Sequence, residues 1–239
     1  MKKISVNAKN SKGFTLLELL IVIAIIAILS VVLILVLNPA EMLKKSRDVQ
    51  RISDLNTLKT AIGLYITSTS TPDLDTGTSL CIPTSGATAK ISYSAELADS
   101  SSCATTVSKG SDAAGGSFST TDNCRYGGTS GAAAIDGTGW LPVNLGSLTG
   151  GSPISNLPLD PVNTIGTATA PTSTDLVYRY ACQESVTGGK PSYIFELDAQ
   201  LESNAYTSED DKRSKDGGDN TNFYEVGTSL RLLGSGVNF

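Results

Sequence analysis

The stretch Gly13-Phe14-Thr15-Leu16-Leu17-Glu18 leads into residues 19–37, which contain no charged side chain. About 20 apolar residues in a helix cross the hydrocarbon core of a bilayer, so this run predicts one membrane-spanning helix. Glu18 lies at its start, where a carboxylate in lipid costs roughly 2.5–3.5 kcal/mol and therefore indicates a function. The run is too long for the apolar core of a secretory signal, and its far end lacks a small-residue cleavage site. We expect the helix to be retained.

The charges on either side of this run predict its orientation. Lys2, Lys3, Lys9 and Lys12 precede Phe14, and no acidic residue does. The positive-inside rule therefore places the amino terminus in the cytoplasm and the rest of the chain outside, as a single-pass protein of the cytoplasmic membrane. The whole chain carries −5 and the four lysines +4, so residues 14–239 carry −9. An acidic exported body argues against direct nucleic-acid binding, which needs clustered Lys and Arg.

The pattern becomes amphipathic after Asn38-Pro39. Apolar residues recur at intervals of mostly three and four: Leu43, Val49, Ile52, Leu55, Leu58, Ile62, Tyr65 and Ile66. Charged residues are expected on the other faces: Lys44, Lys45, Arg47, Asp48, Arg51, Asp54 and Lys59. This predicts a membrane segment at 14–38 and an amphipathic segment at 39–66, joined as one helix that Pro39 kinks. The alternative is two helices separated at Pro39.

Residues 67–239 predict one globular domain. Residues 67–139 are rich in Ser, Thr and Gly and show little periodicity, with a short helix expected around residues 93–98. Strand-forming runs follow at 176–181 (LVYRYA), 193–197 (YIFEL) and 223–226 (FYEV), with a further candidate at 230–233 (LRLL). The predicted fold class is therefore α+β, with a long helix packed against a small antiparallel meander. Trp140, the only tryptophan, is expected to pack in this domain, with an exposed binding role as the alternative.

The four cysteines all lie on the exported side: Cys81, Cys103, Cys124 and Cys182. An even number in an oxidising compartment favours two disulfides. The spacing does not choose among the three possible pairings. A zinc site is the weaker reading, because the chain has no His and no C-x-x-C pair.

The segment from Gly13 to Glu18, followed by an Ile/Val/Leu helix, resembles the class III signal of type IV pilins and type II secretion pseudopilins. The resemblance covers residues 12 to about 37. It implies that residues 1–13 are a leader, that a prepilin peptidase cuts between Gly13 and Phe14, and that Phe14 is then N-methylated. Leu157-Pro158-Leu159-Asp160-Pro161 is also similar to a segment of major pseudopilins, although Val162-Asn163 stands where those proteins usually have Trp-Gly.

The resemblance implies a structural subunit of a type IV pilus-like filament. The implied partners are other copies of the chain in a helical homopolymer, prepilin peptidase, an assembly ATPase, a membrane platform protein, and membrane lipid before assembly. Glu18 is then expected to pair with the Phe14 amine of a neighbouring subunit, because each charge is costly when buried alone. The filament would be extracellular or periplasmic. A major-pseudopilin role in type II secretion is the alternative.

The acidic loop at residues 209–220 is the one candidate ligand site that we identify in the sequence. Carboxylates on a Gly-containing turn suit a hard cation such as Ca²⁺, and major pseudopilins carry a calcium site in a comparable late loop. Asp211, Asp216 and Asp219 are the expected ligands. The spacing does not match an EF-hand, and Lys212, Arg213 and Lys215 partly balance the acids, so a solvated surface loop is the competing interpretation.

The sequence offers little support for catalysis. Without any His, the chain lacks the usual general base and the commonest metal ligand, and it contains no G-x-S-x-G motif and no P-loop. We therefore expect a protein that is not an enzyme and needs no cofactor apart from the candidate calcium ion. A membrane-anchored enzyme or binding protein that uses only this type of anchor is the alternative of a different class.

Overall fold

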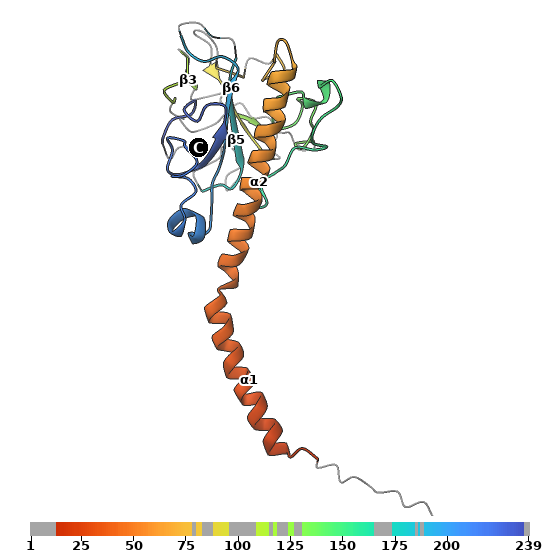
Figure 1. Cartoon of the computed structure of the whole chain (residues 1–239), viewed down its shortest axis with the longest axis vertical. Coiled ribbons are helices and arrows are strands. Elements are labelled where there is room, and N and C mark those ends of the chain that lie inside the picture. The colour runs from red at the N-terminus through yellow and green to blue at the C-terminus, as the bar shows by residue number, and fades with distance from the viewer. Residues whose placement is uncertain are drawn as a thin grey trace, which may run out of the picture. The chain divides into compact units, whose positions relative to one another are not determined.

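The computed structural model describes residues 13–77, 80–82, 88–95, 109–114, 117–118, 124–126, 131–164, 174–184, 186 and 189–236. The chain divides into two compact units, residues 1–43 and 44–239, and each is described by itself. An apolar helix forms most of the described part of the first unit, and the second packs a helix against a small sheet (Figure 1). The predicted α+β fold class is confirmed.

Helix α1 spans Leu16–Leu37, and its start is capped by Thr15. Among the described residues, α1 is the one helix that is long and apolar enough to cross a membrane, over Leu16–Ile34. Asn38 ends the helix in the left-handed conformation, with φ 39°. A residue before proline is disfavoured in the α region, whereas proline suits the first position of a new helix. Residues 16–68 therefore form two helices, α1 and α2 (Pro39–Ser68), so the expectation of one continuous helix is wrong and its alternative is confirmed.

Helix α2 buries a stripe that differs in part from the predicted one. Leu55, Leu58, Ile62 and Tyr65 are buried as expected, together with Ala61. Toward the start of the helix, however, the predicted stripe residues Leu43 and Val49 are 62% and 49% exposed. Asp48 and Arg51, which were expected on other faces, are fully buried instead. They continue the same three- and four-residue spacing, and buried charges of this kind are tolerated because they are paired.

The main sheet has five strands in the order β4-β2-β5-β6-β7: Cys124–Tyr126, Ile91–Tyr93, Tyr178–Gln183, Ile194–Ala199 and Tyr224–Gly227. Strands β5, β6 and β7 form the predicted antiparallel meander. Strand β2 pairs antiparallel with β5, and β4 pairs parallel with β2 at the edge. A separate two-stranded sheet joins β1 (Thr88–Ala89) and β3 (Ser117–Phe118).

Two smaller predictions differ from the structure. Residues 230–233 do not form a strand, and Leu233 makes only an isolated bridge to Lys109. Tyr93 belongs to strand β2 and not to a short helix; residues 96–98 of that expected helix lie outside the described residues.

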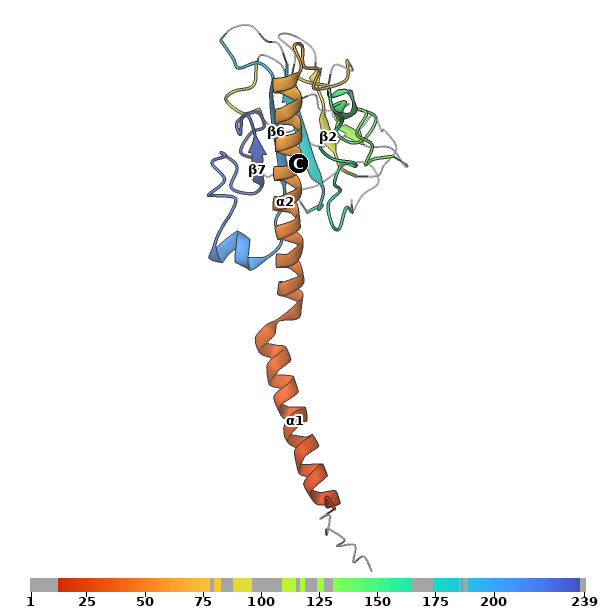
Figure 2. The same cartoon turned by 45° about the vertical axis from the view of Figure 1, so that its right-hand side comes forward.

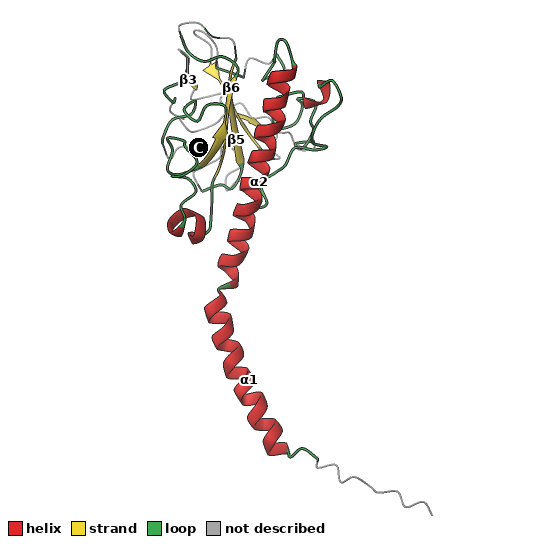
Figure 3. Cartoon of the chain, in the orientation of Figure 1, coloured by secondary structure: helices red, strands yellow, loops and turns green. Residues whose placement is uncertain are grey.

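Alternate residues of the sheet face two different layers. Phe195, Leu197 and Ala199 on β6 join the core formed with α2, which covers this face of the sheet (Figures 2 and 3). Ile194 belongs to a second apolar cluster, which includes Leu232 and Leu233 from the carboxyl-terminal segment. The sheet is therefore buried on both faces, and even polar residues that alternate with apolar ones along β6 are enclosed.

Trp140 packs in the core between α2 and the sheet. Its ring is fully buried, and its Nε1 donates to the Pro158 carbonyl oxygen at 3.0 Å. The predicted packing role is confirmed. Trp140 is therefore a suitable fluorescence reporter of the folding of the second unit.

Candidate functional site

The predicted processing junction lies in exposed backbone just before the first helical turn. Gly13, Phe14 and Thr15 are outside the helix, and the Phe14 side chain is 82% exposed. Thr15 has extended backbone angles, φ −80° and ψ 150°. A Cβ added at Gly13 would meet no atom within 4 Å. The peptide bond between Gly13 and Phe14 is thus accessible and free of helical hydrogen bonds, as a peptidase requires of its substrate.

Glu18 closes a capping box with Thr15. Its carboxylate Oε2 accepts hydrogen bonds from the Thr15 backbone N at 2.9 Å and from the Thr15 hydroxyl at 2.8 Å. In return, Thr15 Oγ1 accepts from the Glu18 backbone N at 3.2 Å. This arrangement satisfies donors that the first turn would otherwise leave unpaired, and it places a negative charge at the positive end of the helix. Within one chain, Glu18 therefore defines where the helix begins. Its pairing with a second copy stays a prediction.

The rest of α1 presents an apolar surface on all sides. Its described large side chains are between 44% and 87% exposed within the chain. The one polar side chain in residues 19–37 is Ser30, whose hydroxyl donates to the Ile26 carbonyl oxygen at 2.7 Å. Because the helix satisfies this hydroxyl internally, residues 19–37 require only apolar contacts from their surroundings.

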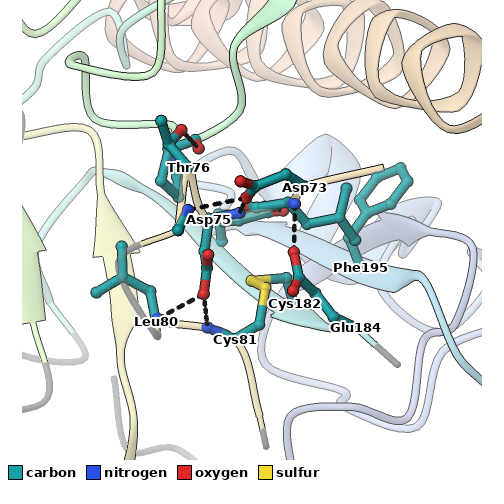
Figure 4. Close-up of a disulfide and its surroundings, with 12 residues drawn as sticks. Asp73, Asp75, Thr76, Leu80, Cys81, Cys182, Glu184 and Phe195 are labelled. Carbon is teal, nitrogen blue, oxygen red and sulfur yellow. Dashed lines mark hydrogen bonds between the residues drawn. A yellow bond between two sulfur atoms is a disulfide. The ribbon is translucent and has the colours of Figure 1, made fainter. Parts of the chain in front are cut away.

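One of the two predicted disulfides is present, between Cys81 and Cys182 (Figure 4). It joins the segment that follows α2 to strand β5 across 101 residues of sequence. Asp75 supports this segment, since its carboxylate accepts hydrogen bonds from the backbone N of Leu80 at 2.7 Å and of Cys81 at 3.0 Å. Cys81 and Cys182 are thereby excluded as zinc thiolates. Cys103 and the side chain of Cys124 lie outside the described residues.

The predicted calcium ligands do not form one group in the described part of the chain. Asp211 pairs with Arg213, whose Nε lies 3.0 Å from Asp211 Oδ1. Asp216 accepts from the backbone N of Gly218 at 2.9 Å and of Glu225 at 2.8 Å, and Asp219 is exposed. Two of the three carboxylates thus hold the loop in shape. Calcium binding by this set stays a prediction.

A buried ion network around Arg51 was not predicted. Arg51 donates to Asp160 through Nε at 2.6 Å and Nη2 at 3.0 Å, and through Nη1 to Asp48 at 2.8 Å and Glu202 at 2.7 Å. Burial alone would lower the pKa of Arg51, but the carboxylates of Asp160 and Glu202 raise it above the usual value. Arg47 also reaches Glu202, at 2.7 Å. The network fastens the early part of α2 within the second unit to the segment that resembles the L-P-x-D-P motif.

Comparison with known proteins identifies the amino-terminal segment. A family model described as the prokaryotic N-terminal methylation motif matches residues 8–34. No curated protein and no solved structure matches the chain. The chain therefore carries the class III signal of type IV pilin-like and pseudopilin-like precursors, and this family signal points to a structural protein. The match includes Gly13, Phe14 and Glu18 and ends at residue 34, before the second unit begins.

Proposed function

We propose that this protein is a structural subunit of a type IV pilus-like filament. The observation that carries the proposal is the methylation motif on a helix whose described apolar side chains are exposed. In this function, prepilin peptidase cuts the accessible bond between Gly13 and Phe14 and methylates the Phe14 amine. The subunit waits in the cytoplasmic membrane with its amino terminus inside, and it then enters an extracellular or periplasmic filament.

The apolar surface of α1 explains why two environments suit this helix. In lipid, apolar helices gain little by associating, because the acyl chains are as apolar as their side chains. In a filament outside the membrane, each helix must be covered by other copies, which stabilises the assembly by roughly 25 cal/mol per Å² of buried apolar surface. Moving from the first environment to the second requires work, so an assembly ATPase and a membrane platform protein are the proposed partners.

Glu18 sets the register in which two subunits dock, which an apolar surface alone does not specify. Its carboxylate is the one charge between Phe14 and Leu37, and cleavage creates one complementary amine at Phe14. A neighbour docked out of register leaves both charges unpaired in an apolar surrounding, where each costs several kcal/mol. The Thr15 bonds satisfy only part of the capacity of a carboxylate, which has two oxygens and about four lone-pair sites.

Two measurements test the proposal. The intact mass of the mature protein should begin at an N-methylated Phe14, whereas retention of Met1 and the four lysines would support the membrane-anchored enzyme or binding protein instead. Glu18→Ala should remain in the membrane but yield no filaments in the sheared fraction. The control Glu209→Ala removes an exposed carboxylate from the second unit and should assemble normally. Normal filament yield from Glu18→Ala would overturn the pairing.

A major-pseudopilin role is the second candidate. The observation that favours it is the segment around Asp160, which resembles major pseudopilins and is held in the structure by Arg51 at 2.6 Å. Electron microscopy of material sheared from the cell surface distinguishes the two functions. Long surface filaments containing this chain support the pilus, and their absence from the sheared material supports a short periplasmic pseudopilus.

A further inference from the structure

A second group of charged residues lies on the face of the sheet that points away from α2. The strand register places Arg179 on β5 opposite Asp198 on β6, and Asp198 opposite Glu225 on β7. Glu196 lies two residues before Asp198 and therefore on the same face. Three acidic side chains and one basic side chain thus share one patch across three adjacent strands. β6 and β7 run side by side in Figure 2.

These acidic side chains are deeply buried. Glu196 and Asp198 are 0% exposed and Glu225 is 1% exposed. One carboxylate oxygen from each lies within 4.8 Å of one from each of the others. Carboxylates this close repel one another strongly in a buried site, where water does not screen them. The structure must therefore offset the repulsion.

The protein itself satisfies only one oxygen of each carboxylate. Glu196 Oε2 accepts from the backbone N of Leu232 at 2.7 Å and of Leu233 at 3.0 Å. Asp198 Oδ2 accepts from Arg179 Nε at 2.8 Å, and Glu225 Oε2 accepts from the Asn220 backbone N at 3.0 Å.

The second oxygen of each carboxylate has no such donor. Glu196 Oε1, Asp198 Oδ1 and Glu225 Oε1 are buried without a hydrogen-bond partner in the described structure. A buried polar atom without a partner costs about 1–3 kcal/mol, more if charged, so three together in one cluster point to a ligand that would satisfy them.

The surrounding backbone is shaped around this cluster. A Cβ at Gly218 would lie 1.7 Å from Glu225 Oε2, so only glycine allows the carboxylate to take its position. Asp216 closes the same loop by accepting from the backbone N of Glu225 at 2.8 Å. On the other side, the Arg179 guanidinium lies over the Phe223 ring, 4.4 Å from its centroid. Arg179 is thus held in place and offsets one of the three negative charges.

We propose that Glu196, Asp198 and Glu225 form a binding site for one hard divalent cation, with Ca²⁺ the best fit. Three carboxylates and one guanidinium leave a charge of −2, which a divalent cation neutralises. Carboxylate oxygens are the ligands that Ca²⁺ takes, at about 2.3–2.6 Å and in flexible geometry. Mg²⁺ demands near-ideal octahedral geometry at about 2.0–2.1 Å and gives up its water reluctantly, so it suits this buried site less well.

The site is distinct from the late loop, because its ligands stand on β6 and β7. The loop residue Asp216 contributes by holding the Glu225 backbone.

The test uses the full-length chain in detergent, stripped with a chelator and then dialysed against buffers containing Ca²⁺ or Mg²⁺. Metal analysis should find one Ca²⁺ per chain. Thermal unfolding, followed by Trp140 fluorescence, should shift upward by about 5–10 °C at a Ca²⁺ concentration of roughly 100 times Kd. The same concentration of Mg²⁺ should produce a smaller shift.

Two variants and one control locate the ion. Glu225→Gln removes one ligand and one charge, while Gly218→Ala pushes the flexible end of the Glu225 side chain away and leaves its charge in place. Both should unfold cooperatively and lose the bound Ca²⁺ and the thermal shift. Glu209→Gln, which changes an exposed carboxylate that is not a predicted ligand, should keep both. Absence of retained Ca²⁺ in the folded wild-type chain, its retention by both variants, or its loss in Glu209→Gln would each overturn the proposal.

Discussion

Replacing Arg51 by Met gives the sharpest test of how the second unit is held together. Arg51 is fully buried, and its guanidinium contacts the carboxylates of Asp48, Asp160 and Glu202. Methionine fills the volume of the aliphatic stem but removes the charge. Asp48 keeps backbone donors at Glu202 and Ser203, whereas Asp160 loses both of its bonds to Arg51 and keeps only backbone donors at 2.8 Å and 3.3 Å.

Removing one partner of a buried ion pair costs about 3–5 kcal/mol, because the other charge stays buried and uncompensated. We therefore expect Arg51→Met to lower the free energy of unfolding by about 3–5 kcal/mol and the melting temperature by roughly 10 °C. Denaturant titration of the full-length chain in detergent, followed by Trp140 fluorescence, measures the change. The matched control is Arg47→Met, since Arg47 pairs with Glu202 but has a side chain that is 31% exposed; its loss should be much smaller.

A double-mutant cycle separates the ion pair from simple packing. Asp160→Asn removes the charge that Arg51→Met leaves uncompensated, so the double variant should lose at least 1 kcal/mol less than the sum of the single losses. Additivity within about 0.5 kcal/mol would refute the pairing argument. A loss below about 1 kcal/mol in Arg51→Met would refute the burial argument as well.

Two further predictions concern the disulfide and the acid stability of the second unit. Replacing Cys81 and Cys182 together by Ser should lower the free energy of unfolding by about 4–5 kcal/mol, as expected for a closed loop near 100 residues, measured against wild type without reductant. Burial would raise the pKa of Glu202, but its hydrogen bonds to Arg47 and Arg51 hold the pKa below the usual value. The stabilisation from these bonds is therefore present above about pH 4.3, and it is lost as the pH falls through the lower folded-state pKa. Acid titrations should show a smaller loss of stability in Arg51→Met than in the wild type over that window. Identical slopes of the unfolding free energy against pH would contradict the assignment of this effect to Glu202.

The sequence predicted most of the features that have a local signal. Residues 16–37 form a helix because apolar side chains continue without interruption, and the three strands of the meander follow β-branched and aromatic runs. Pro39 correctly marked a boundary. The favoured single helix was wrong because the restriction on the residue before proline outweighed the continuing helical pattern at Asn38.

The remaining features depend on contacts that no local pattern contains. The burial of Arg51 was not predicted, because its partners Asp160 and Glu202 lie 109 and 151 residues away. Glu196 and Asp198 alternate with apolar residues along β6, which normally indicates a solvent-exposed face. Here the carboxyl-terminal segment covers that face, and the two side chains become ligand candidates. Strands β2 and β4 were missed because they are short and lie in a Ser/Thr/Gly-rich region.

Under the proposed function, Glu18 affects the energetics of assembly as well as its register. The apolar side chains of α1 favour lipid over water, so each one opposes removal of the subunit from the membrane. A carboxylate near the end of the span instead raises the free energy of the membrane state, at most by the roughly 2.5–3.5 kcal/mol that it costs at the centre of a membrane helix, and the Thr15 capping box offsets part of this. Under the proposed function, that remainder is recovered when the charge meets the Phe14 amine of a neighbour. The same residue then lowers the work of extraction and restricts the productive docking position, which an uncharged helix of equal length does not do.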